Sequence, residues 1–378
     1  MNKINKSLTA EAVRLLNVSD VPDLYHRIRR WARLHIKHEP VAPIDRINWP
    51  KGILMTGLLH KAEELKNADN SVDRASCVYA VASVQEYLDR WIYGGTPVFY
   101  IDDSLAGLAL LMLSEIYRHE DDVLSDKYLR AAGFIADFLK GQRTDPEGVI
   151  PYRPAHGNDL IFADSSGMVL PFLIRYGVIK RDDDAIDMGL RQIRAVMKYG
   201  IDPESGLPCH AYSLIGDEGK VPETVKRIRN TDANGEYPGW CRYAPGWGRA
   251  LGWIMYGFGM CAEVLDRYGA ISPLEIQVQN EIHRHLTTLS GTALEYVRDD
   301  GLYGSIINDP SSMPDTSATA MIYYGQTRYG EGADVTNLLP YITSAGEVKG
   351  AQGECQGLGV YSDDYGSYPW SVGSVLML

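Results

Sequence analysis

The hydrophobic pattern of the chain is dominated by six apolar segments that are nearly free of charge and rich in Gly, Ala and Ser. Each follows a loop rich in Gly, Pro, Asp or aromatic residues, and successive segments start 53, 62, 83, 68 and 53 residues apart. A recurring apolar segment of this length predicts a recurring buried helix. The six predicted helices begin near Trp49, Asp102, Asp164, Trp247, Asp315 and Tyr368.

Helices of a second kind alternate with the apolar ones. Within residues 124–140, apolar side chains fall on one face and charged side chains on the other, which is typical of a surface helix. Five further segments have a similar pattern, although it is weak in the last of them: 10–38, 72–91, 182–199, 273–290 and 331–343.

Six inner and about six outer helices in alternation predict an all-α fold, the (α/α)6 barrel or six-hairpin toroid. The alternative is an open helical solenoid, but such an array keeps a regular repeat and a consensus that this chain lacks. No change of composition and no Ser/Gly linker divides the chain, so we expect a single catalytic domain over residues 1–378. The longest predicted loop, 201–246, contains five Pro and six Gly, and we expect it to line a site.

Strict alternation makes every inner helix start at the same end of the barrel. Helix N-termini present unpaired N–H groups and a partial positive charge, so a ring of six favours an anionic or polyhydroxylated ligand. Carboxylates, an arginine and tryptophans at these starts are suited to proton transfer, carboxylate binding and sugar stacking. The candidates are Trp49, Asp102, Asp103, Asp164, Trp247, Arg249, Trp253, Asp315, Thr316, Tyr368 and Trp370.

Each candidate also has a purely structural interpretation. Asp is a common helix N-cap, and we interpret Asp315 as a cap, whereas Asp164 and Asp102 stand at matching positions after strand-like entries. Arg249 lies in an otherwise chargeless run and therefore needs a partner, either an internal carboxylate or one on the ligand. His210 is a loop histidine that serves either structure or the site.

Composition and charge argue against several classes of function. The net charge of −12 and the lack of a basic stripe argue against nucleic acid as a partner. The longest apolar run, 250–262, is too short to span a bilayer. No signal peptide is evident and the five cysteines are scattered, so we expect a cytoplasmic protein with reduced thiols. Metal-binding and nucleotide-binding motifs are missing, so we expect no metal and no cofactor; the oligomeric state stays open between a monomer and a homodimer.

Four motifs, read in order, give the chain a resemblance to a known family. They are ADSSGMVLPFL at 163–173, WGRALGW at 247–253, DGLYGSIINDP with DTSATAMIYYG at 300–325, and GECQGLGV with YPWSVGSVLML near the C-terminus. Together they resemble glycoside hydrolase family 105, the unsaturated rhamnogalacturonyl hydrolases, and more distantly family 88, the unsaturated glucuronyl hydrolases. The likeness extends from Trp49 to the C-terminus.

The resemblance implies an (α/α)6-barrel hydrolase for pectin-derived fragments. Its substrate would be an oligosaccharide with a terminal 4,5-unsaturated uronate left by a polysaccharide lyase, and the likeness to family 105 favours a rhamnogalacturonan disaccharide. An aspartate would protonate C4 of the vinyl ether and help water add at C5, giving a hemiketal that opens and releases the next sugar.

The resemblance also assigns roles to residues of this chain. Asp164, followed by Met168 and Pro171, matches the catalytic aspartate, and Asp102 before Gly107 matches the second catalytic acid. The substrate-binding residues implied are Trp49, Asp103 as a near match to the acidic position, Arg153, His210, Trp247, Arg249 and Trp253.

The chain departs from the family pattern at two places. Ala250-Leu251 and Ser165-Ser166-Gly167 replace the usual residues, which leaves the preference for the released sugar open. The alternatives are a family 88-like enzyme acting on other polysaccharide fragments, a conventional glycosidase that uses two carboxylates, and a catalytically silent sugar-binding barrel.

Overall fold

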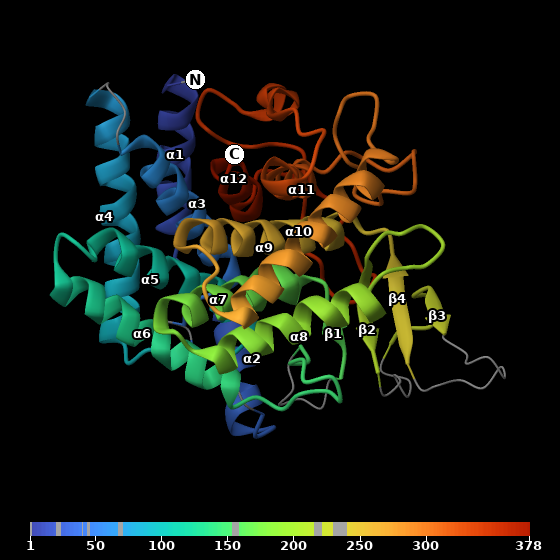
Figure 1. Ribbon diagram of the computed structural model, residues 1–378, viewed down its shortest axis with the longest axis horizontal. Helices are drawn as coiled ribbons and strands as arrows, with labels where there is room; N and C mark the ends of the chain where they lie inside the picture. Colours follow the sequence, from blue (N-terminus) through green and yellow to red (C-terminus); the bar gives the residue numbers. More distant parts are fainter. Residues whose placement is uncertain are drawn as a thin grey trace.

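The computed structural model describes residues 2–19, 24–39, 41–43, 46–66, 71–152, 159–214, 221–229 and 240–378, and the chain in it is mostly helical (Figure 1). The α-helices are α1 (Asn2–Leu16), α2 (Leu24–His35), α3 (Trp49–Leu65), α4 (Ser71–Tyr93), α5 (Ser104–Tyr117), α6 (Asp122–Lys140), α7 (Asp164–Lys180), α8 (Asp183–Tyr199), α9 (Gly248–Tyr268), α10 (Pro273–Leu294), α11 (Thr316–Tyr329) and α12 (Pro369–Leu376). Two 3-10 helices matter below: η1 (Ile101–Asp103) and η3 (Val335–Tyr341).

Six of these helices form a closed inner ring. In chain order α3, α5, α7, α9, α11 and α12 each pack against the next, and α12 returns to pack against α3. Their side chains are buried around almost the whole circumference, as expected for helices enclosed on all sides. The predicted starts agree with the observed ones to within two residues, and the (α/α)6 barrel is confirmed.

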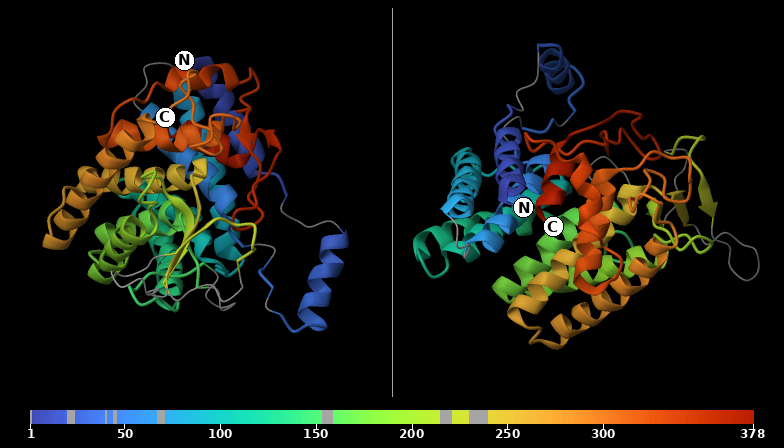
Figure 2. Two further views of the ribbon diagram at one scale, coloured as in Figure 1. Left: turned by 90° about the vertical axis from the view of Figure 1, so that its right-hand side faces the viewer. Right: turned by 90° about the horizontal axis from the view of Figure 1, so that it is seen from above.

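The outer layer matches the prediction less closely. Helices α4, α6, α8 and α10 each pack on the inner helix that precedes them, and α1 packs on α3 and α12. The last outer helix, expected over 331–343, is the short η3, which contains Pro340, a residue that cannot donate a helical backbone hydrogen bond. In place of the single helix expected over 10–38, the structure has two helices, α1 and α2. The second, α2, has no buried residue and stands apart from the barrel (Figure 2).

Glycines allow the inner helices α7 and α9 to approach closely. A Cβ on Gly257 of α9 would lie 1.7 Å from the carbonyl oxygen of Ser166, and one on Gly167 of α7 would lie 2.4 Å from the ring of Trp253. Neither position tolerates a side chain without separating the two helices. This contact holds Trp253 against α7 at the end of the barrel where the helices start.

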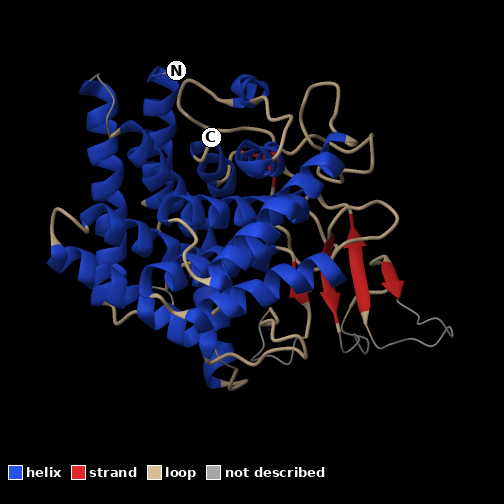
Figure 3. Cartoon of the chain, viewed as in Figure 1, coloured by secondary structure: helices blue, strands red, loops and turns tan. Residues whose placement is uncertain are grey.

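A small sheet crosses that end, on one side of the molecule (Figure 3). Strands β1 (Ile161–Phe162), β2 (Cys209–Ser213), β3 (Arg227–Arg229) and β4 (Cys241–Pro245) form an antiparallel sheet in the order β1-β2-β4-β3. The N–H of Ala163 also donates to the carbonyl of His210, at 2.9 Å, which ties the start of α7 to β2. A second antiparallel pair joins β5 (Ala351–Gln352) and β6 (Tyr365–Gly366).

No helix within the described residues combines the length and the apolar character needed to cross a membrane.

Candidate active site

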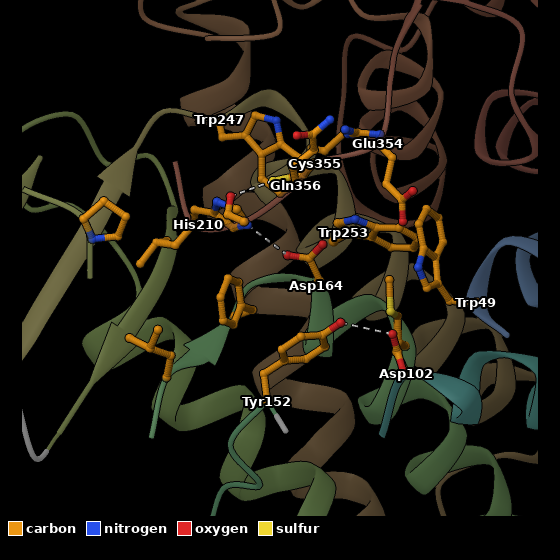
Figure 4. Close-up of a pocket in the computed structure, with 17 residues that line it drawn as sticks. Trp49, Asp102, Tyr152, Asp164, His210, Trp247, Trp253, Glu354, Cys355 and Gln356 are labelled. Carbon is orange, nitrogen blue, oxygen red and sulfur yellow. Dashed lines mark hydrogen bonds and ion pairs between the residues drawn. The ribbon is translucent and has the colours of Figure 1, made fainter. Parts of the chain in front are cut away.

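A cavity of about 360 Å³ lies where the inner helices begin. Its wall combines residues from α3, η1, α7, β2 and α9 with a loop between β5 and β6 (Figure 4). The lining residues are Trp49, Asp102, Tyr152, Leu160, Phe162, Asp164, Met168, His210, Pro222, Trp247, Arg249, Trp253, Glu354, Cys355, Gln356, Gly357 and Leu358.

Asp164 is the first residue of α7, and its carboxyl group faces this cavity. The side chain is 22% exposed, and Oδ2 has no hydrogen-bond partner among the described residues. Burial raises the pKa of Asp164 to about 7, and the charge of Asp102 adds to the rise, whereas the residue's own backbone N–H and Arg249 act against it. This largely buried carboxyl group at a helix start thus keeps its proton near neutral pH, because desolvation raises its pKa more than the helix N-terminus lowers it.

His210, the second residue of β2, lies beside Asp164. Its Nε2 is 3.7 Å from Oδ2 of Asp164, while Nδ1 accepts the backbone N–H of Gly359 at 3.3 Å. Burial lowers the pKa of His210 to about 3, with a further contribution from Arg249, so the ring is neutral. Since Nδ1 is an acceptor, the single proton of the neutral ring sits on Nε2 and is directed towards Asp164.

Arg249, the second residue of α9, is buried in the wall of the cavity. Its guanidinium donates to the carbonyls of Gln352 and Gly353, at 3.3 and 2.6 Å, and Nε lies 3.9 Å from Oδ2 of Asp315. The guanidinium carbon also lies 5.0 Å from the ring centre of Trp247. Of the two kinds of partner that the sequence left open, the structure supplies an internal carboxylate, that of Asp315. Arg249 also lines the cavity, and its charge acts on Asp164.

The two neighbouring aspartates of η1 point in different directions. Asp102 lines the cavity, where the hydroxyl of Tyr152 donates to its Oδ2 at 3.2 Å. Asp103 is fully buried, accepts the backbone N–H groups of Phe99 and Tyr100, and is paired with Arg46. Asp103 therefore stands behind the wall as an anchor for η1, and Asp102 is the acid that reaches the cavity.

Most of the residues singled out from the sequence converge on this cavity. The structure brings together Trp49, Asp102, Asp164, His210, Trp247, Arg249 and Trp253. Asp103 does not line it, and Arg153 lies outside the described residues. Asp315 is an N-cap, as interpreted: its Oδ1 accepts the N–H groups of Ser317 and Ala318. The segment 201–246, predicted as a loop, instead contains strands β2, β3 and β4, and it lines the site through His210 and Pro222.

Sequence reasoning missed one whole wall of the cavity. Residues 354–358 of the loop between β5 and β6 line it, and Tyr361 from the same loop stacks on Trp247 with ring centres 5.1 Å apart. The motif GECQGLGV marks this loop, but it contains no helix start and so fell outside the ring of candidates. Tyr152 was also missed, because it does not lie at a helix start either.

The described residues contain no group of three or more His, Cys, Asp or Glu side chains placed to hold a metal ion.

These features define a class of protein: the chain is a glycoside hydrolase, with carboxyl groups and tryptophans around a cavity at the start of an (α/α)6 barrel. More closely, it belongs to Glycosyl Hydrolase Family 88, whose model matches residues 25–328. No curated protein matches the sequence.

Solved structures share the fold at low sequence identity. A possible family 105 member from Salmonella enterica serovar Paratyphi A is 15% identical, with a TM-score of 0.69 over 100% of this chain and 93% of that one. A family 105 glycoside hydrolase from C. acetobutylicum is 16% identical, with a TM-score of 0.64 over 92% and 96% of the two chains. An unsaturated glucuronyl hydrolase from Bacillus sp. GL1 is 19% identical, with a TM-score of 0.57 over 99% and 94%. The suspected relationship to families 105 and 88 is confirmed.

Proposed function

We propose that the protein removes a 4,5-unsaturated uronic acid from the non-reducing end of lyase-generated oligosaccharides by hydrating its vinyl ether. The observation that carries the proposal is Asp164, a carboxyl group with a pKa of about 7 that faces the cavity beside a neutral histidine. Protonating a carbon atom needs an acid that still holds its proton near neutral pH, and Asp164 meets that need.

The reaction begins with transfer of the proton of Asp164 to C4 of the unsaturated ring. Positive charge develops at C5 and the ring oxygen, a water molecule attacks C5, and the Asp164 carboxylate takes up the proton that the water releases. The product at C5 is a hemiketal, which opens and frees the next sugar. Asp164 ends the cycle protonated, so one residue serves as acid and then as base.

The substrate carboxylate is assigned to the side of the cavity that holds Arg249 and His210. The positive field of Arg249 attracts the anion, and the Nε2 proton of His210 is available as a donor. An anion bound here raises the pKa of Asp164 further, which keeps the acid protonated in the complex. Trp49, Trp247 and Trp253 present ring surface to the sugar, and Arg153 is assigned to the same substrate.

Asp102 is assigned an assisting role. Its charge raises the pKa of Asp164, and its Oδ2 is oriented by Tyr152. A carboxylate at this place stabilises positive charge on the ring in the transition state and can hold the attacking water.

The substrate that we favour is a rhamnogalacturonan disaccharide from pectin. Two observations support this choice. The sequence motifs resemble family 105, and the fold is similar to that of a possible family 105 member and to that of a glycoside hydrolase from family 105. The competing substrate is a glucuronyl fragment, since a neighbour of similar fold is an unsaturated glucuronyl hydrolase described as responsible for glycosaminoglycan degradation.

The test is loss of ultraviolet absorbance from a panel of lyase-generated oligosaccharides, with pectin fragments first. Hydration destroys the conjugated double bond, so absorbance falls as the neighbouring sugar appears. Release of that sugar with the absorbance retained would instead identify a conventional glycosidase that uses Asp102 and Asp164 as its two carboxylates. If no sugar is released from any fragment, the remaining alternative is a barrel that binds sugar without catalysis.

The proposal includes a cytoplasmic location and a single domain over residues 1–378. All five cysteines are unbridged, which fits a reducing compartment. Cell fractionation tests the location, and limited proteolysis tests the domain by asking whether any fragment folds alone.

A further inference from the structure

A second cavity, of about 570 Å³, adjoins the candidate active site. The two cavities share four lining residues: Trp49, Asp102, Tyr152 and Glu354. Asp164 lines only the first of them. The second is bounded by the end of α1, the segment before α3 and the start of α12, including Leu15, Arg46, Tyr100 and Tyr368.

This inference rests on the proposed function, which fixes where the two halves of the substrate lie. The double bond has to reach Asp164, so the unsaturated uronate fills the first cavity and the released sugar lies outside it. Another cavity, of about 630 Å³, lined by parts of α3, α4 and α5, shares no lining residue with the first. Among these described cavities, the one continuous with the reacting centre is therefore the cavity of about 570 Å³.

The basic side chains in the second cavity are already paired with the protein. Arg46 donates to the carboxylate of Asp103 and to the carbonyl of Ile47. The ammonium group of Lys51 is buried and donates to three carbonyls at the end of α1 and just beyond it: those of Leu15, Leu16 and Val18. Neither side chain is positioned to neutralise an anionic group on the released sugar without giving up these contacts.

The acidic side chains are placed differently. Glu354 is exposed, lines both cavities, and has no side-chain hydrogen bond or ion pair within the described part of the chain. Asp102 also lines both cavities, and in the close-up it lies on the opposite side of Trp49 from Glu354 (Figure 4). The passage between the cavities is therefore bordered by two acidic residues and an indole ring.

We propose that Glu354 makes the enzyme select substrates in which the sugar next to the uronate carries no negative charge. A neutral sugar or an amino sugar can rest on Trp49 beside the carboxylates. A sulfate or carboxylate on that sugar meets a like charge, and the two basic side chains among the described lining residues of the second cavity are already paired. The rhamnose of a rhamnogalacturonan disaccharide is neutral and meets this requirement.

The test compares two substrates that differ by one charge: an unsaturated uronyl–N-acetylhexosamine disaccharide and the same disaccharide with a sulfate on the hexosamine. Loss of ultraviolet absorbance gives kcat/KM for each. We expect the wild-type enzyme to prefer the unsulfated substrate by roughly tenfold, the size expected for one charge pair several ångströms apart near a protein surface. Glu354→Gln should bring the ratio of the two kcat/KM values to within about twofold of unity, and added salt should reduce the wild-type ratio because it screens exposed charges.

Glu331→Gln is the matched control, because it removes the same charge from an exposed residue that lines neither cavity. It should leave the wild-type ratio unchanged. If Glu354→Gln also leaves the ratio unchanged, or if the wild-type enzyme prefers the sulfated substrate, the role of Glu354 is overturned. If the wild-type enzyme consumes the double bond of neither these disaccharides nor any pectin fragment, the proposed function itself fails, which is a different result.

Discussion

Two inner helices of the barrel, α7 and α11, both begin at an aspartate, yet the two carboxyl groups are used in opposite ways. Asp315 is fully buried and its Oδ1 accepts the N–H groups of Ser317 and Ala318, so it closes the start of α11. Asp164 makes no such cap, faces the cavity, and has an Oδ2 without a hydrogen-bond partner among the described residues. Residue type and position on the helix are nearly the same, so the difference comes from where the carboxyl group points.

That difference decides the chemistry available to each group. The carboxylate of Asp315 is occupied by two backbone donors of α11, lies near Arg249 and does not line the cavity. Asp164 lacks those donors, and burial raises its pKa to about 7. An aspartate at the start of an inner helix is therefore available for catalysis when its carboxyl group does not accept the backbone N–H groups of that helix. It has a structural role when it does.

The largest effect that separates the two residues is on turnover. Asp164→Asn keeps the size and polarity of the side chain but removes the acid, so kcat should fall by about 10²- to 10⁴-fold, the usual contribution of a general acid. The fold and substrate binding should persist. The measurement is the rate of absorbance loss together with substrate affinity by calorimetry.

Asp183→Asn is a suitable control for this variant, since Asp183 starts the outer helix α8 at an exposed position. It should behave as wild type. Near-normal turnover by Asp164→Asn would mean that another residue is the general acid, and Asp102 would be the first to test.

The next effect is the pH dependence of kcat/KM. The protonated form of Asp164 is the active one, so activity should be halved near pH 7 and fall about tenfold per pH unit above it, or about a hundredfold by pH 9. His210, with a pKa of about 3, stays neutral and should add no limb between pH 5 and 9. Activity that rises above pH 7 would mean that Asp164 acts first as a base or nucleophile.

Stability provides an independent check of the same pKa. The folded protein favours the protonated form of Asp164, so the stability due to this group is present below about pH 4 and is lost as the pH rises to about 7. Asp164→Asn should therefore unfold at a higher temperature than wild type at pH 8 and show little difference at pH 4. The same shift at both pH values would contradict a raised pKa.

Much of the contrast between helix starts could be read from the sequence. The inner helices were predictable because apolar, small-residue segments recur. Six of the seven predicted site residues that line the cavity lie at or near the starts of these helices, and the seventh, His210, lies on β2. The roles of Asp102 and Asp103 could not be separated, since adjacent residues differ only in side-chain direction, and that depends on the turn of η1 and on Arg46. Glu354 was not among the predicted site residues because it lies in the loop between β5 and β6, away from any helix start.

The smallest effect concerns Asp315, the structural member of the pair. Asp315→Ala removes a buried cap and leaves Arg249 without its nearby carboxylate, so we expect a loss of about 2 kcal/mol in the free energy of unfolding. Asp121→Ala is the matched comparison, because Asp121 caps the outer helix α6 through Leu124 from an exposed position, and it should lose about 1 kcal/mol. Urea unfolding measures both. Turnover of Asp315→Ala, measured well below its unfolding temperature, should fall less than that of Asp164→Asn, because Arg249 keeps its two carbonyl partners. A stable Asp315→Ala protein without turnover would show that both aspartates belong to the chemistry, and the distinction between a capping and a catalytic helix start would not hold.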